Sequence, residues 1–349
     1  MTGGHQRTGV LLDTPPMEAK LVDGLPDGPG WQYEPKWDGF RCLAFKSGET
    51  VELRAKSGKS LTRYFPDIVA AFKEIALERF VFDGELAIPV GKTLSFEALQ
   101  LRLHPAESRV RRLAAETPAI LISFDCLMDM TGASLVAAPL TERRRTLEDL
   151  LAAAGCPALR LTPYTRTLTT ARTWLERAGG ALDGVVAKKL DGPYRPGERD
   201  MLKVKHLRTA DCVVGGFRYE TGSRLVGSLL LGLYDNEGEL DHVGFTSAIA
   251  DADRLALTRR LEPLIEPPGF SGDAPGGPSR WSNARSTEWQ PLRNELVVEV
   301  RYDHVTGQRF RHGTALVRWR PDKAPAQCTF EQLEKPARPG RLMKAIRSA

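Results

Sequence analysis

Hydrophobic positions in the first part of the chain, up to about residue 205, alternate between two spacings. Short, dense apolar runs indicate strands, and apolar positions three or four residues apart indicate helices. At 63–78, for example, Phe65, Ile68 and Phe72 follow the helical spacing. Such an alternation predicts an α+β fold with mixed strand order. The expected elements are strand–turn–strand at 31–45, a helix at 63–78, a strand at 79–88 broken by Asp83-Gly84, helices at 96–103 and 108–115, a strand at 119–127, a helix at 141–154 and a strand at 182–188.

The pattern changes after residue 205, where strand-like runs predominate. Five short strands with one helix suit a small closed β-barrel of the OB-fold type, which commonly binds oligonucleotides. We therefore predict a boundary near residues 206–209 and two domains, 1–206 and 207–349. The expected elements are strands at 210–219, 225–234, 241–245, 296–302 and 314–319, a helix at 251–264, and a long loop rich in Pro, Gly and Ser at 266–291.

Composition excludes several classes of protein. Hydrophobic residues make up 42% and charged residues 27% of the 349 positions, a balance typical of globular proteins. No apolar run approaches the length of a membrane span, and the start of the chain is polar and Gly-rich, so we expect a soluble protein without a secretory signal. The five cysteines form no CxxC pair, which argues against a disulfide framework or a zinc site and favours a cytoplasmic location.

Charge is distributed unevenly along the chain. Residues 304–349 contain ten Lys and Arg against three Asp and Glu, whereas the preceding residues carry 39 basic and 41 acidic side chains. A basic C-terminal segment on a nearly neutral body suggests a phosphate-rich partner such as a nucleic acid.

The sequence EPKWDGFR at 34–41 places Lys36 in an aromatic setting beside acids and close to Arg41. A lone lysine on a strand most often extends its amine into solvent. Desolvation and a neighbouring positive charge can instead lower a lysine pKa and make the amine a nucleophile. The residues around Lys36 favour a nucleophilic role, provided that further motifs accompany them.

This octapeptide resembles the KxDGxR signature of the covalent nucleotidyltransferases, which include ATP-dependent DNA ligases, RNA ligases and mRNA capping enzymes. Further elements that resemble the motifs of this family follow in order. They are Asp83-Gly84-Glu85, Ser123-Phe124-Asp125, DGVVAK at 183–188, Lys203-Val204-Lys205, RFRH at 309–312 and RWRPDK at 318–323. Six elements in one order make a chance match very improbable.

The resemblance implies a role for each matching residue. Lys36 would attack the α-phosphorus of ATP, and the remaining catalytic residues would supply positive charge or orient the leaving pyrophosphate: Arg41, Lys203, Lys205, Arg320, Asp322 and Lys323. Glu34 would lie at the adenine end, Phe124 would stack on the base, and Glu85 would contact ribose or metal. The full set of expected ATP contacts is Glu34, Lys36, Arg41, Lys56, Glu85, Phe124, Lys188, Lys203 and Lys205. Glu85 and Asp183 would hold Mg²⁺ or Mn²⁺.

Two positions depart from the family pattern. Asp183 stands where the family usually has Glu, and its carboxylate reaches less far toward a metal because the side chain is one methylene shorter. Lys56 stands in Ala55-Lys56-Ser57-Gly58 where Ser-Arg-Asn-Gly is common. Lysine keeps the charge but lacks the two-pronged guanidinium of arginine for a phosphate.

Longer stretches, including FEALQLRLHPAESRV at 96–110 and KHLRTADCVV at 205–214, resemble bacterial ATP-dependent DNA ligases of the small C type. This resemblance implies an ATP-grasp-like adenylation (nucleotidyltransferase) domain followed by an OB-fold domain. It also implies use of ATP with a divalent cation, a lysyl-AMP intermediate, and a monomer that seals nicked duplex DNA in repair, working on the nucleoid in the cytoplasm. The basic segment beyond Pro336 would then be free to contact duplex phosphates.

Other functions share part of this pattern. An mRNA capping guanylyltransferase would have the same lysines and RxDK end but would take GTP, and an RNA ligase would usually lack the second domain. A DNA-binding module that has lost catalysis would lack Lys36 or the phosphate-binding lysines, all of which are present.

Overall fold

The computed structural model describes residues 12–91, 93–176, 182–276, 288–333 and 347–348. The chain divides into two compact units, Met1–His206 with Pro336–Ala349 and Leu207–Lys335. Each unit is described by itself. In the described residues no helix is both long and apolar enough to cross a membrane. The basic segment beyond Pro336 lies outside the described residues except for 347–348.

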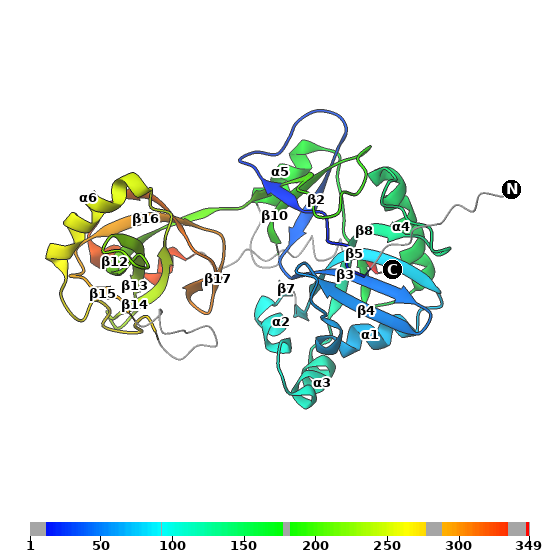
Figure 1. The fold of residues 1–349 in the computed structure, drawn as a ribbon, viewed down its shortest axis with the longest axis horizontal. Coiled ribbons are helices and arrows are strands. Elements are labelled where there is room, and N and C mark those ends of the chain that lie inside the picture. Colours follow the sequence, from blue (N-terminus) through cyan, green and yellow to red (C-terminus); the bar gives the residue numbers. More distant parts are fainter. Residues whose placement is uncertain (1–11, 92, 177–181, 277–287, 334–346, 349) are drawn as a thin grey trace. The chain divides into compact units, whose positions relative to one another are not determined.

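Two β-sheets form the centre of the first unit (Figure 1). All strand pairs are antiparallel except β8–β9 and β1–β11, so the mixed α+β fold is as predicted. The larger sheet contains, in spatial order, β20 (Arg347–Ser348), β9 (Leu159–Leu161), β8 (Ile120–Met128), β5 (Arg79–Ala87), β3 (Phe40–Ser47) and β4 (Thr50–Ala55). The smaller sheet contains β1 (Ala19–Leu21), β11 (Met201–Lys205), β10 (Leu182–Lys189) and β2 (Trp31–Trp37).

Two helices, α1 (Pro66–Lys73) and α4 (Leu140–Ala154), pack against strands of the larger sheet. α3 (Glu107–Glu116) packs on α1 and on α2 (Phe96–Arg102), while α5 (Leu168–Glu176) contacts β2 and β10. The predicted helix at 63–78 is shorter than expected. Pro66 begins α1 because its ring suits the first turn of a helix, and the preceding residues form a separate 3-10 turn, Thr62–Tyr64. A short hairpin of β6 (Pro89–Val90) and β7 (Thr93–Leu94) precedes α2.

Both faces of β3 are buried, which places this strand between two cores. Cys42 and Ala44 pack in the core that contains α1 and α4. Leu43 and Phe45 point the other way and pack with Met201 of the smaller sheet. Because side chains alternate along a strand, residues that follow one another in β3 serve opposite cores, and the space between the two sheets is available for a site.

The strand predicted at 79–88 is continuous, so the expected break at Asp83-Gly84 was wrong. β5 passes through both residues, and only its pairing with β8 shifts there. Gly84 is required by close approach: a Cβ at this position would lie 2.9 Å from the carbonyl oxygen of Ile122. The glycine therefore permits tight strand packing beside the site and does not form a turn.

The second unit is built on a six-stranded sheet, in which five strands follow the order β14-β13-β12-β16-β19 and the sixth, β15, pairs with β12. The strand order and the helix between the third and fourth strands match an OB-type Greek key. The elements are β12 (Arg208–Tyr219), β13 (Val226–Tyr234), β14 (Leu240–Thr246), α6 (Asp251–Leu261), β15 (Gln290–Pro291), β16 (Val297–Tyr302), β17 (Val305–Thr306), β18 (Arg309–Phe310) and β19 (Ala315–Trp319), with 3-10 turns at Glu262–Leu264, Pro325–Gln327 and Phe330–Gln332.

The predicted closed barrel is not formed by the strands of the described residues. The two end strands of the sheet, β14 and β19, share no ladder, and one bridge between Thr246 and Thr314 joins this edge. Phe310 of β18 packs on Gly244 of β14, where a Cβ would lie 2.9 Å from the ring. Side-chain packing therefore joins these segments where a closed barrel would have a strand pair. In the long loop, 266–276 form no helix or strand, and 277–287 lie outside the described residues.

His242 on β14 makes the stability of the second unit depend on pH. Burial, with Arg309 and Arg218 nearby, lowers the pKa of His242 from 6.5 to about 4. The unfolded state then binds more protons than the folded state between these values, so stability falls as pH decreases from 6.5 to 4. We expect a loss of up to about 1.4 kcal/mol per pH unit in the unfolding free energy of this unit.

Chemical denaturation at pH 7 and pH 5 measures this effect. In a His242→Phe variant, whose ring can keep the edge-to-face contact with Phe270, the loss between the two pH values should be smaller. Equal losses in wild-type protein and variant would contradict the assignment.

Candidate active site

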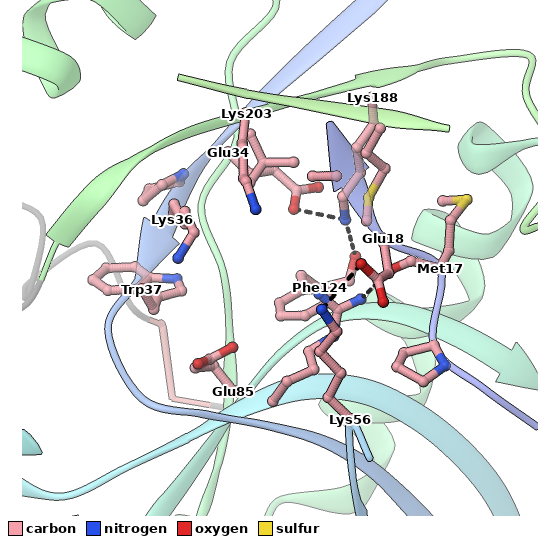
Figure 2. Close-up of a pocket in the computed structure, with 16 residues that line it drawn as sticks. Met17, Glu18, Glu34, Lys36, Trp37, Lys56, Glu85, Phe124, Lys188 and Lys203 are labelled. Atoms are coloured by element: carbon pink, nitrogen blue, oxygen red, sulfur yellow. Dashed lines mark hydrogen bonds and ion pairs between the residues drawn. The ribbon is translucent and has the colours of Figure 1, made fainter. Parts of the chain in front are cut away.

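A pocket of about 210 Å³ lies in the first unit, between the two sheets. Its walls come from the segment before β1 and from β2, β3, β5, β8, β10 and β11. Eight residues predicted from the sequence line it: Glu34, Lys36, Arg41, Lys56, Glu85, Phe124, Lys188 and Lys203. Figure 2 shows the amino groups of Lys36 and Lys203 and the carboxylate of Glu85 pointing into a common space.

Lys36 is held by a carboxylate of the neighbouring strand. Its Nζ lies 2.5 Å from Oδ2 of Asp183, which is 4% exposed, while the Lys36 side chain is 26% exposed. Lys205 approaches the same oxygen at 3.4 Å. The register explains this arrangement, because Gly184 of β10 is opposite Lys36 on one side and opposite Lys205 on the other. Asp183 therefore binds the amines of Lys36 and Lys205, so that three residues predicted from the sequence contact one another through one carboxylate.

Gly184 is what allows these strands to lie so close. Its φ of 151° is rarely adopted by residues with a side chain, and a Cβ would collide with the carbonyl oxygen of Val204. The strand pairing that brings Asp183 to both amines depends on this glycine.

A buried ion pair forms the end of the pocket where Glu34 lies. Oε2 of Glu34 is 2.8 Å from Nζ of Lys188, and each side chain is 4% exposed. Gln32 donates to Oε1 of the same carboxylate at 2.8 Å. Lys188 also donates to the carbonyl oxygen of Phe124 at 3.1 Å and lies over its ring at 4.7 Å (Figure 2). Lys188 thus joins the other two predicted residues, with an ion pair to Glu34 and contacts to the carbonyl oxygen and ring of Phe124.

Arg41 is locked by Asp83, a partner that the sequence analysis did not single out. Nε and Nη2 of Arg41 each donate to one carboxylate oxygen of Asp83 at 2.6 Å. Burial disfavours the charged guanidinium, but Asp83 outweighs it and raises the pKa of Arg41 above its ordinary value. The guanidinium lies 4.5 Å from the ring centroid of Phe124. Because the pair is neutral overall, Arg41 adds less net positive charge to the pocket than its motif implied.

Glu85 and Lys203 have shifted pKa values. Burial raises the pKa of Glu85 to about 7, although Lys36 and Arg41 oppose the shift. The pKa of Lys203 is lowered by burial and then by the positive charges of Lys36, Lys205 and Lys56. A carboxylate that burial disfavours, next to crowded amines, is typical of a site that receives charged ligands.

Lys56 faces an acidic residue from the start of the chain. Its Nζ lies 3.0 Å from Oε2 of Glu18, and this contact lowers the pKa of Glu18 (Figure 2). Glu18 belongs to residues 16–19, which line the pocket and which the sequence analysis did not identify. Their only sequence signal is a short apolar and charged run without periodicity, too weak to indicate a wall of the site.

Arg320, Asp322 and Lys323 lie in the second unit, where Arg320 and Lys323 bind Asp211. Nη1 of Arg320 donates to both carboxylate oxygens of Asp211 at 2.8 and 3.0 Å, and Nζ of Lys323 lies 2.9 Å from Oδ2. Asp322 accepts from the other edge of Arg320 at 2.9 Å. Arg320 therefore links Asp322 to Asp211, an aspartate to which the sequence analysis gave no role.

Comparison with known proteins decides the family. The model of the ATP dependent DNA ligase domain matches residues 16–205, and that of the ATP dependent DNA ligase C terminal region matches 222–323. The chain belongs to the ATP-dependent DNA ligases. This ligase is 48% identical to DNA ligase C2 of Mycolicibacterium smegmatis over 347 residues, covering 94% of this chain and 96% of the relative. It is 44% identical to DNA ligase C of Mycobacterium tuberculosis, covering 94% and 95%.

A solved structure from a study of Lig E DNA ligases supports the fold of this ligase. The two share 16% identity with a TM-score of 0.56, over 87% of this chain and 99% of the other. The family assignment confirms the resemblance stated from the motifs and identifies the chain as a DNA ligase that uses ATP.

Proposed function

We propose that this ligase seals nicks in duplex DNA through a lysyl-AMP formed on Lys36. The contact between Lys36 and Asp183 carries the proposal, since it fixes an amine at the wall of a pocket that also presents Lys203 and Glu85. In the first step the Lys36 nitrogen would bond to the α-phosphorus of ATP. The bond from that phosphorus to the bridging oxygen would break, and pyrophosphate would leave.

The pocket residues suit the needs of phosphoryl transfer, which are alignment and charge neutralisation. Asp183 would orient the amine of Lys36 until a phosphate takes its place. Lys203 and Lys205 would bind the α-phosphate, which remains part of AMP. Lys56 would bind a phosphate as well, once its ion pair with Glu18 has opened. Glu34, fixed by Lys188, would accept a hydrogen bond from the exocyclic amine of adenine, and Phe124 would contact the base.

A divalent cation fits this site as an ion shared between one carboxylate and the phosphates of ATP. Among the described residues no group of three or more His, Cys, Asp or Glu is arranged to hold a metal. Mg²⁺ nevertheless binds to one or two carboxylates together with substrate phosphates. Glu85 is suited to this role because a cation would offset the burial that raises its pKa to about 7. Asp183 already binds two amines, so Glu85 is the better first ligand of the predicted pair. A bound cation would neutralise charge on the phosphates.

Glu85→Gln is expected to raise the Mg²⁺ concentration needed for half-maximal self-adenylation by about tenfold or more, because an amide is a much weaker ligand for a hard cation. The measurement is uptake of α-labelled ATP as Mg²⁺ is titrated. Glu52→Gln on β4 provides a control at an acid outside the pocket, and it should not change the requirement. An unchanged Mg²⁺ requirement in Glu85→Gln would remove Glu85 as the ligand.

The remaining steps would use the second unit and the DNA. AMP would pass from Lys36 to the 5′-phosphate of a nick, and the 3′-hydroxyl would displace it to join the strand. Arg320, Asp322 and Lys323 would orient pyrophosphate in the first step. We assign 1–206 as the adenylation domain and, in place of the 207–349 expected from the sequence, 207–335 as the OB-type domain, because residues 336–349 belong to the first unit, where β20 pairs with β9. We propose that the enzyme acts as a monomer in DNA repair in the cytoplasm.

A sealing assay tests the proposal against its alternatives. Nicked duplex DNA, the same duplex with ribonucleotides flanking the nick, and single-stranded RNA are each incubated with ATP or GTP. We expect joining of the DNA nick with ATP only. Joining of RNA strands alone would favour an RNA ligase, and covalent uptake of GTP in preference to ATP would favour a guanylyltransferase.

A further inference from the structure

Four residues from four separate segments form a closed ring of hydrogen bonds beside the pocket. The Tyr194 hydroxyl donates to Oδ2 of Asp83 at 2.6 Å and accepts from the backbone nitrogen of Met17 at 2.8 Å. Asp83 binds Arg41, as described above. Nη2 of Arg41 closes the ring by donating to the carbonyl oxygen of Met17 at 3.1 Å.

The ring attaches the segment around Met17, which precedes β1, to the pocket. Met17 is held at both its backbone nitrogen and its carbonyl oxygen, by a hydroxyl and a guanidinium. The following residue, Glu18, binds Lys56, and β1 then pairs with β11, so residues 16–19 form part of the wall of the pocket (Figure 2). Residues 16–18 lie in no strand or helix. Backbone hydrogen bonds to residues 197, 198 and 201 hold Pro16 and Glu18, while the backbone nitrogen and carbonyl oxygen of Met17 are held by the ring.

Tyr194, like Asp83, belongs to the ring without lining the pocket, whereas Met17 and Arg41 line it. It lies in the loop between β10 and β11 and is 2% exposed. Burial and then Asp83 raise the pKa of Tyr194, so the hydroxyl keeps its proton and can donate to the carboxylate. The guanidinium of Arg143, which binds Asp125 beside Phe124, lies 5.7 Å from its ring centroid. One buried side chain thus connects three predicted motifs with the N-terminal segment.

We propose that Tyr194 is a positioning residue for ATP binding, which holds Met17 and Arg41 in the places where they line the pocket. The inference rests on the proposed function, because it assumes that the pocket receives ATP. Neither Lys36 nor Asp183 belongs to the ring. The ring therefore sets how well ATP is bound and leaves the transfer of AMP to Lys36 largely unchanged.

Tyr194→Phe tests this role by removing one oxygen atom. It eliminates two hydrogen bonds of the ring and leaves the aromatic packing. We expect the ATP concentration for half-maximal self-adenylation to rise about tenfold, while the limiting rate at saturating ATP changes less than about threefold. Amide hydrogen exchange at Met17 should become fast, while the amides of β5 stay protected.

Tyr33→Phe is the matched control. Tyr33 is 1% exposed and its hydroxyl donates to the carbonyl oxygen of Pro26 at 2.7 Å, so the variant loses a buried hydroxyl in the same unit outside the ring. We expect it to leave both the ATP dependence and the exchange at Met17 unchanged. A similar rise in half-saturation in both variants would show general loosening and overturn the proposal.

Two further outcomes would also overturn it. Unchanged protection of Met17 in Tyr194→Phe would show that the hydroxyl does not hold the segment, and unchanged half-saturation would show that the segment does not matter to ATP. If the wild-type protein takes up no AMP, the proposed function fails. Direct calorimetric titration with ATP then decides the inference, with weaker binding in Tyr194→Phe supporting it and equal binding overturning it.

Discussion

Lys36→Ala is expected to abolish covalent uptake of AMP, with a loss of about 1000-fold or more, because the variant lacks the nitrogen that would bond to the α-phosphorus. Lys36→Arg should fail as severely. A guanidinium can still pair with Asp183, but it stays protonated and has no lone pair for attack. Loss of activity in both variants therefore separates nucleophilic chemistry from a need for positive charge.

The measurement is transfer of label from α-labelled ATP to the protein in the presence of Mg²⁺. Lys189→Ala provides the control, since Lys189 is an exposed lysine at the end of β10, on the strand that carries Asp183. It should be labelled like the wild type. Wild-type labelling of Lys36→Arg would show that another residue is the nucleophile.

Asp125→Leu is expected to destabilise the first unit by about 3–5 kcal/mol. Arg143 and Asp125 form an ion pair in which both side chains are 1% exposed, with Nε 2.7 Å from Oδ1. Nη1 of Arg143 donates hydrogen bonds to the carbonyl oxygens of Ala138 and Gly192. Removing the aspartate leaves a buried positive charge without its partner. The folded state must then either bury an unpaired charge, which lowers the free energy of unfolding, or admit water to the core.

The double variant Asp125→Leu/Arg143→Met should be more stable than Asp125→Leu alone, because it removes the stranded charge together with its partner. Denaturant unfolding of the three proteins measures both effects. Asp149→Ala, at an exposed pair with Arg145 on the same helix, should leave stability unchanged. If the double variant were no more stable than Asp125→Leu, the charge would not be the cause of the loss.

Hydrophobic spacing predicted the longest elements of the fold and missed several others, among them α5, β4 and the shortest strands. The runs at 119–127 and 210–219 are long and apolar enough to indicate strands, and β8 and β12 are found there. β1 and β9 have three residues each and no readable period. They exist because neighbouring strands offer backbone partners, which is information from the whole fold.

The candidate site was predicted residue by residue, but its connections were not. The motifs led to Glu34, Lys188 and Phe124 separately, and only the folded chain shows that Lys188 contacts both of the others. Asp83 lay in a predicted motif but was given no role, and Asp211 was not proposed for the site, because their partners lie far away in the sequence: Arg320 is 109 residues from Asp211. Charge pairing between distant segments has no local pattern. Motif order could therefore indicate which residues meet at the site, but not which carboxylate neutralises which cation.

The central claim is that AMP passes through Lys36 on its way to DNA. Its most direct test is peptide mass spectrometry of the protein after incubation with ATP and Mg²⁺, followed by a chase with nicked duplex DNA without ATP. The account predicts AMP on the peptide that contains Lys36, its loss during the chase, and a matching quantity of joined strands. AMP on a different residue, or AMP on Lys36 that remains on the protein while strands are joined, would contradict it.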